Sequence, residues 1–84
     1  MPQSPLFQFI AEKVLRRVLP SDEPLKLWAG YGNGRSCDGC EKSITATEIE
    51  HELDLPGEVI LRFHVACAGF WGRATGHDGD GSGR

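Results

Sequence analysis

The pattern that most constrains this chain is a pair of short motifs, Cys37-x2-Cys40 and His64-x2-Cys67, separated by 23 residues. Two residues between cysteines let a tight turn direct both sulfurs at one ion, and we expect Gly39 to adopt an unusual backbone conformation there. A histidine and a cysteine three positions apart at the start of a helix lie on the same side of its first turn. The four side chains therefore predict a closed tetrahedral site for one structural zinc ion.

The length of the chain explains why such a site would matter. Its 84 residues include eleven glycines and five prolines, which dilute the segments that can pack. A domain this small buries only about 60–65% of its unfolded surface and usually needs disulfides, a metal or a partner. Structural zinc contributes about 10–16 kcal/mol of apparent binding free energy in finger peptides, as much as the stability of a whole domain. Zinc is therefore expected to decide whether residues 28–72 fold.

The cysteines also indicate a cellular compartment. There are three, an odd number, and all belong to the predicted site; clustered cysteines in a reducing cytoplasm are metal ligands more often than disulfides. An apolar stretch in residues 1–20 is interrupted by charged residues, which predicts neither a signal peptide nor a membrane span: Glu12, Lys13, Arg16 and Arg17. We expect a cytoplasmic protein.

Two other chemistries of a cysteine pair are less favoured. A redox-active C-x2-C motif normally lies in a βαβ frame, which residues 30–36 do not suggest. Catalytic zinc keeps one coordination position open for water, whereas four protein ligands close the shell. His51 is expected to pack or to form a hydrogen bond, and His77 to be solvated. A non-enzymatic protein is therefore predicted.

Residues 4–19 predict an amphipathic helix. Ser4 can cap it, Pro5 suits its first position, and Pro20 ends it. Its apolar residues recur at spacings of three and four and form one broad stripe. The stripe is expected to pack on the domain's own core; self-association, a partner helix and membrane-surface binding remain as alternatives.

The rest of the chain predicts a small sheet and a second helix. A short strand is favoured at Leu25–Ala29, and alternation predicts strands over 45–54 and 59–63 joined at Leu55-Pro56-Gly57. A helix from Thr47 is the alternative to this β-hairpin, because Thr47 and Glu50 mimic a capping box. A short helix should run from His64 to about Gly72. The predicted organisation is an N-terminal helix (1–20), a zinc-finger domain of class α+β (21–73) and a disordered tail (74–84).

Charge is unevenly distributed along the chain. The net charge is −3, with +2 in residues 1–20 and −5 in residues 36–57. An acidic middle is not the electrostatic pattern of a nucleic-acid-binding protein. Nucleic-acid binding, as in a transcription-associated zinc finger, is nevertheless the second hypothesis, with phosphate contacts from Lys13, Arg16, Arg17, Arg35, Arg62 and Arg73. The first is binding of another protein, for which the aromatic residues are candidate contacts if they do not belong to the core: Trp28, Tyr31, Phe70 and Trp71.

The motifs resemble known zinc fingers. The ligand order and gap are similar to the first zinc site of LIM domains, and GRSCDGCEKSI with FHVACAGFW resembles the DNA-nick-sensing finger of poly(ADP-ribose) polymerases. Residues 19–71 most resemble small bacterial proteins with a single treble-clef-like finger. The resemblance implies a zinc knuckle, a β-hairpin and a short helix, with the four ligands at the positions given above. The second zinc site of a LIM domain and the basic face of a nick sensor have no counterpart in this sequence.

Overall fold

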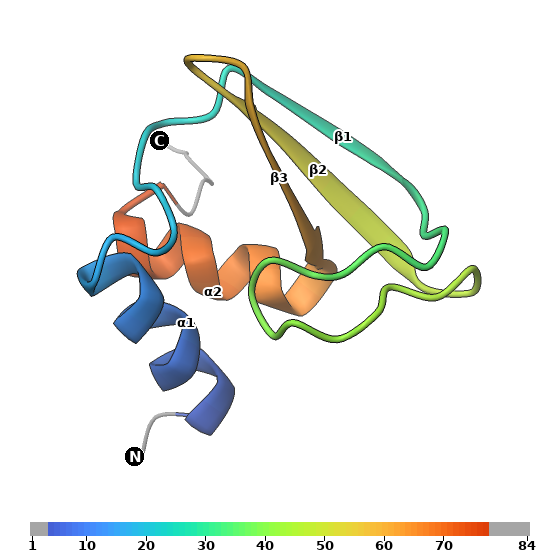
Figure 1. Ribbon diagram of the computed structural model, residues 1–84, viewed down its shortest axis with the longest axis horizontal. Helices are drawn as coiled ribbons and strands as arrows, with labels where there is room; N and C mark the ends of the chain where they lie inside the picture. The colour runs from blue at the N-terminus through green and yellow to red at the C-terminus, as the bar shows by residue number, and fades with distance from the viewer. Residues whose placement is uncertain (1–3, 78–84) are drawn as a thin grey trace.

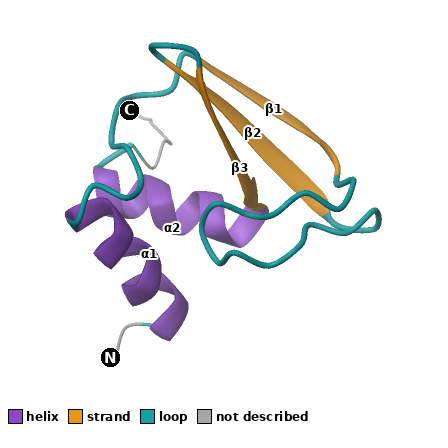
Figure 2. Cartoon of the chain, viewed as in Figure 1, coloured by secondary structure: helices purple, strands orange, loops and turns teal. Residues whose placement is uncertain are grey.

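The computed structural model describes residues 4–77. Within that range the chain forms helix α1 (Pro5–Leu15), strands β1 (Lys26–Tyr31), β2 (Ile49–Leu55) and β3 (Val59–His64), and helix α2 (Val65–Thr75). The two helices lie on the same side of the sheet, and α2 packs against both α1 and the strands β2 and β3 (Figure 1). Figure 2 shows the long loop that leads from β1 back to β2. The predicted α+β class is confirmed.

The strands form one antiparallel sheet in the order β1-β2-β3. The predicted hairpin is confirmed: β2 and β3 pair from Leu55 opposite Val59, and Gly57 has the positive φ of 82° that its turn position requires. The alternative helix from Thr47 is wrong. Residues 46–47 form a turn, in which the Glu48 carboxylate accepts a hydrogen bond from the Thr45 backbone N–H at 2.9 Å. β1 begins one residue later and ends two residues later than the expected Leu25–Ala29 strand.

The core lies between the sheet and the helices. One face of the hairpin contributes buried residues at alternate positions, as a half-buried sheet requires. Trp71 of α2 and Ile10 of α1 are fully buried against this face. Trp71 lies 5.9 Å from Phe63 between ring centroids, and its indole N–H donates to the Pro20 carbonyl at 2.9 Å. The expectation that Trp71 belongs to the core is confirmed, and Phe70 packs at its margin.

Helix α1 is shorter than residues 4–19. Ser4 caps it as predicted, with its hydroxyl accepting from two backbone N–H groups. The helix ends at Leu15 because Arg17 adopts a left-handed conformation (φ 63°), and the Val18 and Leu19 N–H groups both donate to the Lys13 carbonyl. The chain changes direction at this point, and the side chain of Leu19 is buried in the core. Leu6, Ile10 and Val14 of the apolar stripe pack in the core beside α2, so the interpretation as core packing is confirmed for this part of the stripe. Leu15 and Val18 are instead exposed.

Helix α2 is longer than predicted. It continues through a buried Gly72 to Thr75 and ends at Gly76, whose φ of 84° suits a left-handed cap. His77 is half-buried rather than solvated: its ring lies 6.1 Å from Trp71 and its Nε2 lies 2.9 Å from the Ser21 carbonyl oxygen. Residues 74–77 of the predicted tail therefore belong to the helix and its end, and 78–84 lie outside the described residues. Neither helix of the described range is long and apolar enough to cross a membrane.

Candidate metal centre

Two parts of the fold supply the four predicted ligands. Cys37 and Cys40 lie in the cysteine loop, residues 36–43, which a bridge between Ser36 and Ser43 closes. His64 ends β3 and occupies the N-cap position of α2 without a capping side-chain hydrogen bond, and Cys67 lies in the first turn of that helix. The loop is held against β3 by a reciprocal pair of bonds. The Asp38 N–H donates to the Arg62 carbonyl at 2.7 Å, and the Arg62 N–H donates to the Asp38 carboxylate at 2.8 Å.

The ligand atoms of these residues converge. Three sulfurs and one imidazole nitrogen all lie within 4.8 Å of one another. Metal–sulfur bonds of about 2.3 Å place the sulfurs of a tetrahedral site roughly 3.8 Å apart, so small side-chain movements would complete the coordination. Cys37 and Cys67 are only 1% exposed, while Cys40 and His64 are half-buried. The cluster could therefore hold one metal ion.

Gly39 serves this site through its small size. The expectation of an unusual backbone conformation at Gly39 is wrong, because it is not among the residues with positive φ; Glu41, just after the second cysteine, adopts one instead (φ 71°). A Cβ on Gly39 would lie 2.9 Å from the Cys67 Cβ and 3.0 Å from Ile10. A glycine is needed because the loop passes directly over the core.

The Cys37 sulfur is surrounded by backbone donors. The N–H groups of Gly39, Cys40 and His64 point at it, with nitrogen–sulfur distances of 3.3–3.4 Å. Burial by itself raises the pKa of Cys37, but these three bonds and the His64 side chain outweigh it and lower the pKa to about 7. The site is thus built to stabilise a thiolate, the form in which cysteine binds metals.

The imidazole of His64 is oriented from both sides. Its Nδ1 lies 3.4 Å from the Cys40 sulfur, and its Nε2 lies 3.2 Å from both the Ser43 carbonyl oxygen and a Glu48 carboxylate oxygen. With two acceptors beside it, Nε2 carries the proton, which leaves the Nδ1 lone pair facing the sulfurs. Glu48 was not among the predicted site residues. In the sequence it was one of several acidic residues of an expected strand, with nothing to distinguish it.

We expect replacement of Glu48 by alanine to weaken zinc binding about tenfold, because partners of a metal-bound histidine typically contribute 10–100-fold to affinity. Glu48→Gln keeps an acceptor oxygen and should recover part of the loss. Competition titration with a chromophoric chelator measures both variants. Glu23→Ala, which removes an exposed carboxylate outside the site, is the control. Equal affinities for Glu48→Ala and wild type would contradict an orienting role.

Zinc affinity is expected to fall as the pH is lowered below 7. In the metal-free protein, burial and the neighbouring thiolates raise the pKa of Cys67. Burial lowers the pKa of His64, but Cys37 and Glu48 outweigh it and raise it overall. Binding must therefore release protons from both groups, and protons compete more strongly at low pH. Calorimetry in buffers of different ionisation enthalpy counts the released protons; an affinity that does not change between pH 8 and pH 6 would contradict this prediction.

Lys13 connects α1 to the cysteine loop. Its side chain is only 11% exposed, and its ammonium group donates to the carbonyls of Asp38 and Gly39 at 2.6 and 3.0 Å and to the Glu41 carboxylate at 2.8 Å. From the sequence, Lys13 was expected on the polar face of the helix. The sequence could not indicate this role, because the two loop carbonyls that need a hydrogen-bond donor lie beside Lys13 only in the folded chain.

Replacing Lys13 by methionine keeps the aliphatic stem and removes the three donors. We expect the metal-loaded protein to lose about 1–3 kcal/mol of unfolding free energy, the cost of leaving polar groups unsatisfied. Urea denaturation measures it. Arg16→Met, which breaks only the exposed pair with Glu12, should stay within about 0.5 kcal/mol of wild type. Equal losses in the two variants would show that Lys13 does not anchor the loop.

No protein-family model, curated protein or solved structure matches this chain significantly.

Proposed function

We propose that this chain is a non-enzymatic module of the treble-clef type, folded around one structural zinc ion, that mediates protein–protein interaction. The observation that carries the zinc part is the convergence of Cys37, Cys40, His64 and Cys67. Two of these ligands come from a tight loop, and the other two lie where a hairpin strand passes into the first turn of a helix. That order of loop, hairpin and helix is the one implied by the treble-clef resemblance.

The donor set favours zinc among metal ions. Three soft thiolates with one imidazole suit zinc, whereas calcium and magnesium prefer oxygen ligands. A bound zinc would join the cysteine loop to α2 and supply folding free energy. Four protein ligands leave no coordination position for a water nucleophile, which supports a structural role over a catalytic one.

The charged residues support a protein partner over nucleic acid. Of the basic residues proposed as phosphate contacts, Lys13 is held in the cysteine loop and Arg62 lies between Glu50 and Glu52 at 3.4 and 3.7 Å. On the outer face of the sheet, Glu50, Glu52 and Asp54 follow one another at alternate positions of β2. An acidic face repels the phosphate backbone. A gel shift at low salt should accordingly show no complex at micromolar protein.

The surface of β1 supports an interaction role directly. All six of its residues are exposed, including Leu27, Trp28 and Tyr31. Exposed apolar side chains gathered on one strand indicate a binding surface. Affinity capture with the zinc-loaded protein should recover a partner that a Leu27→Lys, Trp28→Lys double variant of equal zinc content does not. Identical capture by the two proteins, or none above background, would contradict the proposal.

A further inference from the structure

The two edges of the sheet differ in whether another segment forms hydrogen bonds with them. On β3, the cysteine loop covers the outer edge: the Arg62 backbone exchanges hydrogen bonds with Asp38, and the His64 N–H points at the Cys37 sulfur. On β1, none of the described segments pairs with the outer edge. Figure 1 shows β1 as the margin of the sheet away from β3. One edge is thus closed by the metal site, and the other is available for pairing.

The register identifies the backbone groups at this free edge. The Gly32 N–H donates to the Glu48 carbonyl, so Gly32 and Glu48 form a hydrogen-bonded pair of the β1–β2 ladder. Such pairs alternate along antiparallel strands, which directs the even-numbered residues of β1 towards β2. The N–H and C=O groups of Leu27, Ala29 and Tyr31 therefore point away from the sheet.

This edge lacks the usual protection against pairing. Natural sheets protect their edges with proline, bulges or several charged side chains. β1 contains no proline, pairs with β2 without a bulge, and carries a single charge, Lys26, at its first position. Its side chains are well exposed, with Tyr31 at 75% and Leu27 at 59%.

We propose that the edge of β1 binds a second copy of this chain, so that two sheets join into one across an antiparallel β1–β1 pair centred on Ala29. This inference rests on the proposed interaction function and names the partner. Residues 27, 29 and 31 all pair with one another through their outward groups only if Ala29 faces Ala29 and Leu27 faces Tyr31 of the second copy. Trp28 then faces Gly30 of the second copy.

The side chains of β1 are self-complementary in this register. A bulky indole faces a glycine, and a Cβ built on Gly30 meets no atom within 4 Å, so the space beside it is open. Leu27 and Tyr31 form an aliphatic–aromatic pair, which favours cross-strand association, and only small alanines meet at the two-fold axis. Lys26 faces the side-chain-free stretch of Gly30 and Gly32 in the second copy, beyond which lies the acidic row of β2. Size and charge thus match a copy of the same strand.

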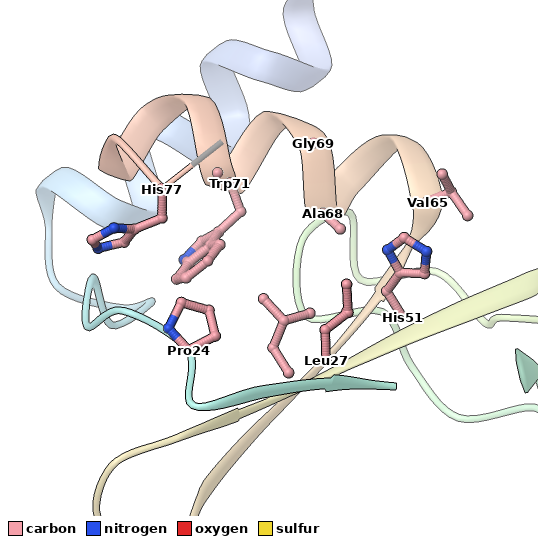
Figure 3. A pocket seen from close by; sticks show the side chains of 10 residues that line it. Pro24, Leu27, His51, Val65, Ala68, Gly69, Trp71 and His77 are labelled. Atoms are coloured by element: carbon pink, nitrogen blue, oxygen red, sulfur yellow. The ribbon is translucent and has the colours of Figure 1, made fainter. Parts of the chain in front are cut away.

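The groove beside β1 is consistent with this occupant. A groove of about 370 Å³ lies between α2 and the inner face of β1 and β2, with Leu27, His51, Val65 and Trp71 in its wall (Figure 3). Because the cross-strand partner of Leu27 lies on the same face, Tyr31 of the second copy would lie at the mouth of this groove. The pairing would therefore cover part of the apolar surface that α2 leaves open.

Sedimentation velocity and native mass spectrometry of the zinc-loaded chain, over a micromolar to millimolar series, test the inference. A six-residue strand is a small interface, so we expect a dimer whose fraction rises with concentration. Ala29→Pro removes an outward N–H without touching the bonds to β2, and Tyr31→Lys places a charge opposite the apolar Leu27 of the second copy. Both variants should remain monomeric with one zinc per chain. Ile60→Lys, an exposed apolar position on β3, is the matched control and should dimerise like wild type.

Several outcomes would overturn the inference. A wild-type protein that is monomeric throughout, dimers that persist in both β1 variants, or a dimer lost equally in Ile60→Lys would each do so. A monomer that instead captures another protein through β1 would also overturn it while leaving the interaction function standing. The zinc content in the same spectra separates the two proposals, because a zinc-free folded chain contradicts the zinc module whatever its oligomeric state.

Discussion

Replacing Cys67 by serine is expected to abolish the cooperative unfolding transition of this protein. Cys67 is buried between Gly39 and the other ligands, so its loss removes zinc and leaves a polar hydroxyl in its place. The binding free energy of structural zinc, about 10–16 kcal/mol, matches or exceeds the stability of a whole small domain. Thermal denaturation followed by the near-ultraviolet signal of the buried Trp71 should show no sigmoidal transition.

The control for this variant is Ala66→Ser, which places the same hydroxyl on an exposed position one residue earlier. It should unfold cooperatively, within about 0.5 kcal/mol of wild type. Chelation of wild type should reproduce the Cys67→Ser result, and added zinc but not magnesium should reverse it. A Cys67→Ser protein with a wild-type melting curve would show that the cysteine belongs to an ordinary core.

Truncation of Trp71 should be the most damaging change outside the metal cluster. The indole is 1% exposed, contacts Phe63, and donates to the Pro20 carbonyl, which joins the segment after α1 to helix α2. Truncations of buried tryptophan to alanine cost about 3–5 kcal/mol. Because the fold is small, we expect Trp71→Ala to unfold in far less urea than wild type even when zinc is saturating.

Trp28 provides the matched comparison, since its indole is half-exposed and its N–H donates to the Asp54 carboxylate at 3.2 Å. Trp28→Ala should change the unfolding free energy by less than about 1 kcal/mol. Trp71→Phe keeps most of the buried volume and loses the hydrogen bond, so its stability should lie between the two. Equal losses of unfolding free energy in Trp71→Ala and Trp28→Ala would contradict the conclusion that Trp71 lies in the core and Trp28 outside it.

Short-range patterns in the sequence were sufficient to predict the hairpin and the four residues of the metal cluster. Alternation and the Pro56-Gly57 turn predicted the pairing of β2 with β3, and ligand spacing predicted which four side chains come together. The Ser4 cap was likewise local. In each case the residues that make the interaction lie close in the sequence or carry distinctive chemistry.

Features that depend on long-range contact were missed. Lys13 is 25 residues from the carbonyl it binds on Asp38, and its position in a helix suggested only an exposed face. Glu48 orients His64 from 16 residues away. The early end of α1 at Leu15, followed by the left-handed Arg17, accompanies the burial of Leu19, which local helix propensity does not predict. These residues show that the metal site is supported by both the N-terminal helix and the turn before β2.

The central claim is that four side chains hold one zinc ion that organises the fold, and native mass spectrometry of the purified protein tests it most directly. We predict one zinc per chain with a compact charge-state distribution, and a shift to the highly charged distribution of an unfolded chain once a strong chelator removes the ion. A metal-free protein that keeps the compact distribution would contradict the claim.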